Sequence, residues 1–175
     1  DATNVVQQPA VCGIAALGMD HQQWLGPTLT AIAGEKAGIA KRGVPLVTDC
    51  YQRQIAARIA EVAEAAGATV LARGDAWDAT VHGDHIAYRD SNGELSLPLP
   101  RLPGHHQAMN AALAVAMLRH QKKVAVPDSA LSAAMGWADW PARMQRLAAG
   151  PLTGTREVWL DGAHNANAAR TLAST

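Results

Sequence analysis

Short apolar segments alternate with longer helical patterns along the first 72 residues, and this alternation limits the possible fold more than any other feature. The apolar segments are 11–17 (VCGIAAL), 44–48 (VPLVT) and 69–72 (TVLA). Continuous apolar runs of this length are typical of strands that are buried on both faces of a parallel sheet. Residues 27–39 and 54–66 carry apolar side chains at helical spacing, with Thr28 as a candidate N-cap and Gly67 as a terminator. The sequence therefore predicts an α/β fold with a mostly parallel sheet flanked by helices.

The pattern changes over residues 78–100, where polar and apolar side chains surround the dipeptide Asn92-Gly93. We expect an antiparallel hairpin at the edge of the sheet, with its turn at this dipeptide. A helix is predicted over 107–120, followed by a shorter helix that Asp128 caps.

The segment 148–155 (AAGPLTGT) is the best candidate for a linker, because it combines glycine, proline and threonine. A strand is predicted over 156–160, and a helix is expected from Ala166 onward. We therefore predict one unit over residues 1–149 and the beginning of a second over 150–175.

Composition argues against several kinds of partner. Lys plus Arg and Asp plus Glu number 15 each, so a net charge of zero gives no electrostatic basis for binding nucleic acid or an anionic membrane. No apolar run reaches the roughly 18 residues that a membrane helix needs, and no signal peptide is visible. Cys12 and Cys50 form no metal or redox motif, and both are expected to be buried free thiols. We expect a cytoplasmic protein.

Two positions are candidates for metal or acid–base chemistry. His21 follows an apolar strand by a few residues, near the carboxyl end where ligands bind in open α/β sheets. Its imidazole could ligate a metal, transfer a proton, or form a hydrogen bond within a loop. Asp20 could orient His21, bind a metal through water, or cap the next turn. Lys36 interrupts an apolar helix face. Its amine could bind a phosphate or act as a nucleophile, or Lys36 could be a solvated lysine paired with a neighbour such as Glu35.

The second half of the chain offers further candidates. Arg143 precedes the predicted linker and could bind a phosphate across a domain interface, or it could lie free on the surface. Asp161, His164 and Asn165 fall in a strand-to-helix loop that could contact ribose, phosphate or a nucleophile, although Asn165 could equally cap the next helix. Asn110 lies within an apolar helix, where its amide could bond backbone or the edge of an adenine.

The order of these motifs closely resembles the folylpolyglutamate synthase/dihydrofolate synthase family, which belongs to the Mur-ligase-like ATP-dependent amide ligases. The resemblance covers almost the whole chain. The matching segments are DATNV from Asp1, LGMDH and LGPT from Leu17, EKAGI from Glu35, HQ and NAA from His106, RMQ from Arg143 and LDGAHN from Leu160. The Asp-His and Glu-Lys-Ala-Gly-Ile segments are the most specific of these.

The resemblance implies an ATP- and Mg²⁺-dependent ligase that adds L-glutamate to dihydropteroate, to folate polyglutamates, or to both. ATP would phosphorylate a carboxylate of the pterin substrate, and the amine of glutamate would then attack the acyl phosphate. Residues 1–149 would form the second half of a central ATPase domain, and 150–175 the first strand and helix of a Rossmann-like C-terminal domain. We expect a monomer that binds these small molecules and neither nucleic acid nor membrane.

The resemblance also implies individual roles. His21 matches a histidine ligand of Mg²⁺, and Lys36 matches a lysine that becomes carbamylated, which would give it oxygen atoms suited to a hard cation. The residues that match nucleotide contacts are Asn110, Arg143, Asp161 and His164. Those that match part of a pterin-binding loop are Asp1 and Ala2.

Some parts of the family pattern have no counterpart here. The glycine-rich phosphate loop, a magnesium-binding glutamate and serine, and most of the C-terminal domain are missing from the sequence. We therefore expect an internal fragment that is inactive by itself. Muramyl-peptide ligases and cyanophycin synthetase remain alternatives within the superfamily. A non-catalytic nucleotide- or pterin-binding module, and a plain α/β domain in which His21 and Lys36 are structural, remain alternatives outside it.

Overall fold

A three-stranded parallel sheet organises the first part of the chain, as the alternating pattern predicts. The computed structural model describes residues 2–175, beginning with the 3₁₀ helix η1 (Ala2–Val5). The sheet order is β1 (Cys12–Ile14), β2 (Pro45–Thr48), β3 (Thr69–Ala72). β1 is shorter than the apolar run 11–17 because Ile14 pairs with Thr48, the last residue of β2, so that the following residues have no ladder partner there.

Helices cover both faces of this sheet. They are α2 (Leu29–Ala37) and α3 (Arg53–Ala66) on one face and α4 (His105–His120) on the other, with the short α1 (Gln22–Leu25) before α2. Leu46 of β2 is fully buried on the α2 and α3 side, whereas Val47 is fully buried on the α4 side. Because neighbouring strand residues point to opposite faces, this arrangement explains the unbroken apolar sequence of β2.

The predicted helix boundaries at Thr28 and Gly67 are confirmed. The Thr28 hydroxyl accepts a hydrogen bond from the Ala31 amide at 3.1 Å, at the start of α2. Gly67 ends α3 with a φ of 74°, a left-handed conformation that glycine adopts without steric cost.

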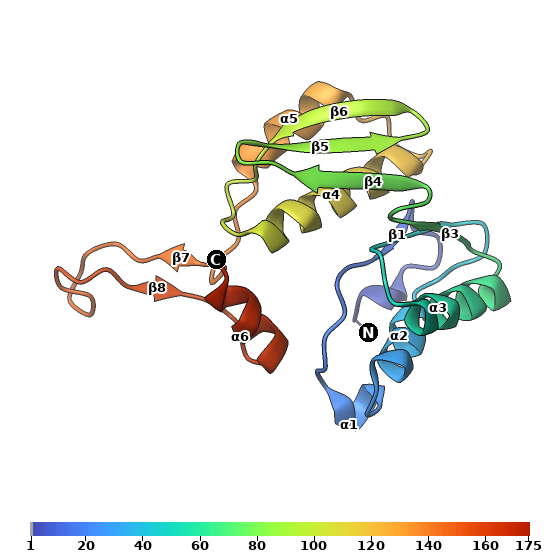
Figure 1. Ribbon diagram of the computed structural model, residues 1–175, viewed down its shortest axis with the longest axis horizontal. Helices are drawn as coiled ribbons and strands as arrows, with labels where there is room; N and C mark the ends of the chain where they lie inside the picture. Colours follow the sequence, from blue (N-terminus) through green and yellow to red (C-terminus); the bar gives the residue numbers. More distant parts are fainter. Residues whose placement is uncertain (1) are drawn as a thin grey trace.

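The hairpin predicted within residues 78–100 belongs to a separate three-stranded antiparallel sheet. Its strands are β4 (Trp77–Val81), β5 (His85–Asp90) and β6 (Gly93–Pro98), and α5 (Asp128–Trp137) packs against β6. α4 contacts both sheets and joins them into one body (Figure 1). The expected turn is shifted by one residue, because Asp90 pairs with Gly93 and leaves Ser91 and Asn92 as the turn. The Asp90 carboxylate holds this turn by accepting a hydrogen bond from the Asn92 amide at 2.8 Å.

Two expectations about single side chains are wrong. Asp128 is the first residue of α5 and not its cap, which is Pro127; the Asp128 carboxylate instead accepts a hydrogen bond from Arg119 at 3.0 Å. Cys12 is buried as expected, but Cys50 is exposed because it lies beyond the end of β2.

The segment predicted as a linker forms the loop of a small hairpin. β7 (Gln145–Arg146) and β8 (Trp159–Leu160) pair in antiparallel fashion, with residues 148–155 between them, and α6 (Ala166–Ala173) follows. This hairpin extends away from the two sheets (Figure 1). It crosses the proposed boundary at residue 150, and the division into two units stays a prediction. None of the helices within residues 2–175 is long and apolar enough to cross a membrane.

Candidate functional site

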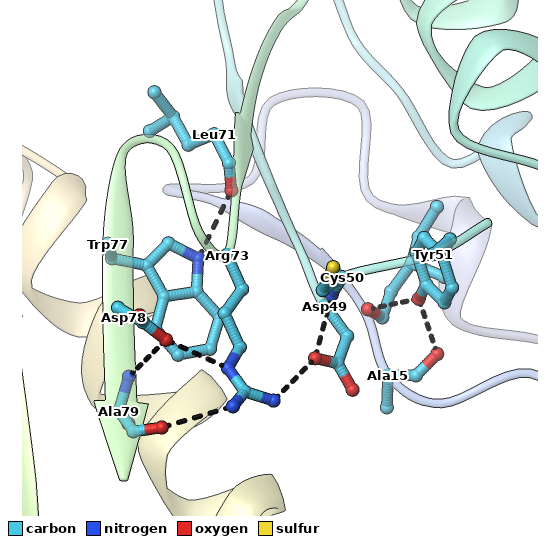
Figure 2. A network of polar contacts seen from close by, with 10 residues as sticks. Ala15, Asp49, Cys50, Tyr51, Leu71, Arg73, Trp77, Asp78 and Ala79 are labelled. Atoms are coloured by element: carbon cyan, nitrogen blue, oxygen red, sulfur yellow. Dashed lines mark hydrogen bonds and ion pairs between the residues drawn. The ribbon is translucent and has the colours of Figure 1, made fainter. Parts of the chain in front are cut away.

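The segment that follows β1 forms one wall of the candidate site, and Tyr51 holds this segment in place. The Tyr51 hydroxyl lies 2.9 Å from the Ile14 carbonyl oxygen and 2.7 Å from that of Ala15, so its single proton is shared between them (Figure 2). Burial, together with the negative charge of Asp49, raises the pKa of Tyr51. The phenol therefore stays protonated and keeps the end of β1 in place.

Arg73 ties the two sheets together beside this exit. Its guanidinium contacts Asp49, just beyond β2, at 3.3 Å and Asp78 of β4 at 3.2 Å (Figure 2). It also donates to the Ala79 carbonyl oxygen at 3.1 Å. These three contacts fix the carboxyl end of the parallel sheet relative to the antiparallel one.

A cavity of about 280 Å³ opens beside the end of β1. Asn110 of α4, Arg143 before β7 and Asp161 after β8 line it together with Ala15 and Ala16. The family resemblance matches Asn110, Arg143 and Asp161 to nucleotide contacts, and these residues come from distant segments of the chain. The fold therefore gathers three of the four predicted nucleotide contacts around one cavity.

Arg143 is presented to the cavity by a strained loop. Its neighbours Ala142 and Met144 have φ values of 59° and 47°, a left-handed conformation that is unfavourable for residues other than glycine. Asp161 stabilises this loop because its carboxylate accepts hydrogen bonds from the amides of Met144 and Ala163, both at 2.8 Å. Strain of this kind is found mainly where a side chain must be held in one place for a function.

His106 also lines the cavity, although the family resemblance implies no individual role for it. Burial lowers the pKa of His106; the charge of Asp161 opposes this effect, and the charge of Arg143 adds to it. A neutral imidazole at this position could donate or accept a hydrogen bond. Asn110 is exposed, and its amide donates to the Gln107 side chain at 3.3 Å.

A second polar group surrounds Asp20. Its carboxylate accepts a hydrogen bond from the Asn165 amide at 2.9 Å, and it lies 3.2 Å from Nε2 of His164 and 3.7 Å from Nε2 of His21. The hydrogen bond from Asn165, followed by that from the His21 backbone, holds the pKa of Asp20 below its ordinary value. The hydrogen bond to the Gly162 carbonyl and the charge of Asp20 raise the pKa of His164.

This second group has the chemistry of a cation site. One ligand atom from each of Asp20, His21 and His164 lies within 4.8 Å of the others. His21 caps α1 in a left-handed conformation, with a φ of 48°, and its ring is exposed. A carboxylate and two imidazoles in this arrangement could hold a divalent cation.

Comparison with known proteins points to one family along the whole chain. The dihydrofolate synthase/folylpolyglutamate synthase of Bacillus subtilis is 34% identical over 183 residues, covering 100% of this chain and 41% of that protein. The corresponding protein of Escherichia coli is 35% identical over 173 residues, covering 98% of this chain and 38% of its own length. The chain is homologous to the folylpolyglutamate synthase/dihydrofolate synthase family. No family model matches it.

Solved structures of this family share the fold. Escherichia coli FolC in complex with DHPP and ADP superposes with a TM-score of 0.82 at 34% identity, covering 98% of this chain and 39% of FolC. A bifunctional folylpolyglutamate synthase/dihydrofolate synthase with Mn, AMPPNP and L-glutamate bound gives a TM-score of 0.78 at 33% identity, covering 99% of this chain and 39% of that protein. The chain therefore spans about two fifths of the length of the relatives that it matches.

The family resemblance assigns His21 and Lys36 to a metal site, and Asp1 and Ala2 to a pterin-binding loop. His21 belongs to the group around Asp20, whereas Lys36 is exposed in the last turn of α2. Ala2 begins η1, and Asp1 lies outside the described residues. The roles of these four residues stay predictions. The bonds from Asp20 to His164 and Asn165 were not foreseen, because they join positions 144 and 145 residues apart.

Proposed function

We propose that this chain is part of an ATP-dependent ligase that adds L-glutamate to dihydropteroate, to folate polyglutamates, or to both. The observation that carries the proposal is the cavity at which Asn110, Arg143 and Asp161 meet. Relatives that are named folylpolyglutamate synthase or dihydrofolate synthase match the chain from end to end, and similar structures hold ADP or AMPPNP. Because the chain spans about two fifths of those proteins, the activity is proposed for a protein of their full length.

Each cavity residue has chemistry that suits a nucleotide. Arg143 carries a permanent charge, and its planar guanidinium can bind a phosphate through two parallel hydrogen bonds. Asp161 would contact the nucleotide while it holds the Arg143 loop through the Met144 amide. Asn110 offers both a donor and an acceptor, as recognition of an adenine edge requires. His164 would contact phosphate from the neighbouring loop.

The proposed reaction has two steps. A carboxylate oxygen of the pterin substrate attacks the γ-phosphorus of ATP, which forms an acyl phosphate and releases ADP. The amine nitrogen of glutamate then attacks the acyl carbon, loses a proton and expels phosphate, leaving an amide. Arg143 would stabilise the charge on the transferred phosphoryl group, and the fixed loop around it would limit reorganisation during the reaction.

We include Mg²⁺ in the proposal, with His21 and a carbamate on Lys36 as its protein ligands. The cluster of Asp20, His21 and His164 supplies one carboxylate and two imidazoles within 4.8 Å, so a cation at His21 fits the residues present. Mg²⁺ prefers oxygen ligands, which the carbamate would add. When bound, the cation would neutralise charge on the phosphates. We also propose that Asp1 and Ala2 belong to a pterin-binding loop. We propose that the enzyme is a monomer and is cytoplasmic.

The test is an assay of the full-length protein for ATP-dependent attachment of labelled glutamate to dihydropteroate and to tetrahydrofolate. We expect activity with at least one of them, and a loss of about 100-fold or more for Arg143→Gln and for Lys36→Ala, because each removes charge stabilisation at the phosphates. Lys41→Ala is the matched control and should retain activity. Residues 1–175 alone should give no product.

Three outcomes would contradict parts of this proposal. Activity with muramyl peptides and none with pterins would assign the chain to another branch of the superfamily. Full activity of Lys36→Ala would remove this residue from the metal site. Binding of ATP without any turnover by the full-length protein would favour a non-catalytic nucleotide-binding module.

A further inference from the structure

A second cavity, of about 450 Å³, lies at the amino ends of β1 and β2. The candidate nucleotide cavity lies at the opposite, carboxyl end of β1, so the two cavities are separate. We propose that the cavity at the amino ends binds a small multivalent oxyanion, with its negative charges on phosphate or carboxylate groups. We call it the amino-end cavity.

The lining of the amino-end cavity is strongly one-sided in charge. Arg42, Lys122 and Lys123 line it, and neither aspartate nor glutamate is among its lining residues. The chain as a whole has equal numbers of acidic and basic residues, so this asymmetry is local. Cations that share a concave surface raise the local concentration of anions.

The two lysines are presented by a loop that a buried side chain holds rigid. Gln121, which is 7% exposed, accepts hydrogen bonds from the amides of Lys123 and Val124 at 2.7 and 2.8 Å. Its own amide donates to the Leu118 carbonyl oxygen at 3.1 Å. A buried glutamine that is satisfied at both ends fixes the backbone of Lys122 and Lys123, which reduces the entropy lost when a ligand binds.

The other walls of the amino-end cavity are fixed as well. The Lys123 ammonium donates to the Gln8 carbonyl oxygen at 2.7 Å, which ties the loop after α4 to the segment before β1. The Arg42 side chain lies over Gly67, where a Cβ atom added to the glycine would approach the Arg42 Cγ to 3.2 Å. The Gly43 amide donates to the Gly67 carbonyl oxygen at 2.9 Å. Both basic segments are therefore held before any ligand arrives.

His120 also lines the amino-end cavity, but its Nε2 atom is buried beside the Asp90 carboxylate and does not face a ligand there. Its side chain is 12% exposed, and its Nε2 atom forms no hydrogen bond within residues 2–175, lying 3.7 Å from the Asp90 carboxylate.

The ligand must carry more than one negative charge. Single ion pairs at an exposed surface contribute little, so a monovalent anion would gain too little from any one of these cations. An anion that reaches Arg42, Lys122 and Lys123 together would sum their contributions, and the cavity is within the size range of sites for small molecules.

Isothermal titration calorimetry of the purified protein tests the proposal, with inorganic tripolyphosphate in one arm and triglutamate in the other. We expect one arm or both to show saturable binding that weakens as salt is raised. Arg42→Gln and Lys122→Gln should each reduce affinity roughly three- to tenfold, and the double variant should reduce it further. The stronger arm identifies whether phosphate or carboxylate is preferred.

Two control variants locate the binding. Lys41→Gln and Arg58→Gln alter cations that line neither the amino-end cavity nor the candidate nucleotide cavity, and neither variant should reduce affinity. Unchanged circular dichroism and thermal unfolding would show that the variants are folded. The proposal is overturned if neither probe binds, if Arg42→Gln and Lys122→Gln bind as the wild type does, or if the loss follows Lys41→Gln or Arg58→Gln instead.

Discussion

At the scale of single residues, the most consequential buried charge is Asp90, whose side chain is fully buried. Arg119 contacts its carboxylate through two nitrogens at 2.8 and 2.9 Å, and the Tyr88 hydroxyl donates to it at 2.9 Å. Asp90→Asn would leave Arg119 without its buried partner, so we expect a loss of about 3–5 kcal/mol in the free energy of unfolding. Urea unfolding followed by circular dichroism measures it. Asp84→Asn, at an exposed carboxylate, is the matched control, and an equal loss in both variants would contradict this explanation.

The same carboxylate predicts how stability depends on pH. Burial alone would raise the pKa of Asp90, but the hydrogen bonds from Arg119, the Asn92 amide and Tyr88 outweigh it and hold the pKa below its ordinary value. A group with a lowered pKa in the folded state stabilises the fold above its unfolded pKa, and this stabilisation is lost as the pH falls through the folded pKa. We therefore expect the free energy of unfolding to fall below about pH 3.9. Asp90→Asn should show a shallower dependence over this range; an unchanged dependence would exclude Asp90 as its source.

At the scale of secondary-structure elements, two glycines make opposite predictions. Gly67 ends α3 in a left-handed conformation with the Arg42 side chain above it, so Gly67→Ala should destabilise the protein by about 1 kcal/mol or more. Gly136 lies in α5, and a Cβ atom there would meet nothing within 4 Å. Gly136→Ala should stabilise the protein by about 0.5–1 kcal/mol, because alanine has less backbone freedom in the unfolded chain. Thermal unfolding of both variants tests the pair, and shifts of the same sign would contradict the assignment.

Local sequence patterns predict most of the helices and strands, but they predict few of the pairings between strands. The buried strand β2 and the partly buried strand β3 follow from apolar runs, and α3 follows from its spacing and from Gly67. β4 was not predicted, because its place in the antiparallel sheet depends on pairing with β5. The hairpin around residues 148–155 has the same cause: glycine and proline mark a loop, but only the contact between β7 and β8 makes it a hairpin, and the role of this segment as a linker stays a prediction.

At the scale of the whole molecule, sequence motifs can propose candidate site residues but cannot predict the contacts between them. Asn110, Arg143 and Asp161 were named one by one from motifs, and the fold places them around one cavity. The part played by His106, and the bond of Asp161 to the Met144 amide, depend on packing between distant segments. No local pattern carries that information, because the same residues at the same spacing would also suit exposed loops.

Asp20 connects the first part of the chain with the loop before α6, and this contact can be tested directly. Asp20→Ala removes its bonds to His164 and Asn165 but leaves the hydrogen bond from the Ala168 amide to the Asn165 side chain, which caps α6. We therefore expect amide hydrogen exchange over residues 161–168 to become several-fold faster, while exchange in β4, β5 and β6 stays unchanged, because local opening is governed by the contacts of the segment itself. Asp75→Ala, at an exposed turn, is the control and should change neither region. If exchange over residues 161–168 is unchanged in Asp20→Ala, Asp20 does not hold this loop, and its other contacts with the cavity wall are sufficient to do so.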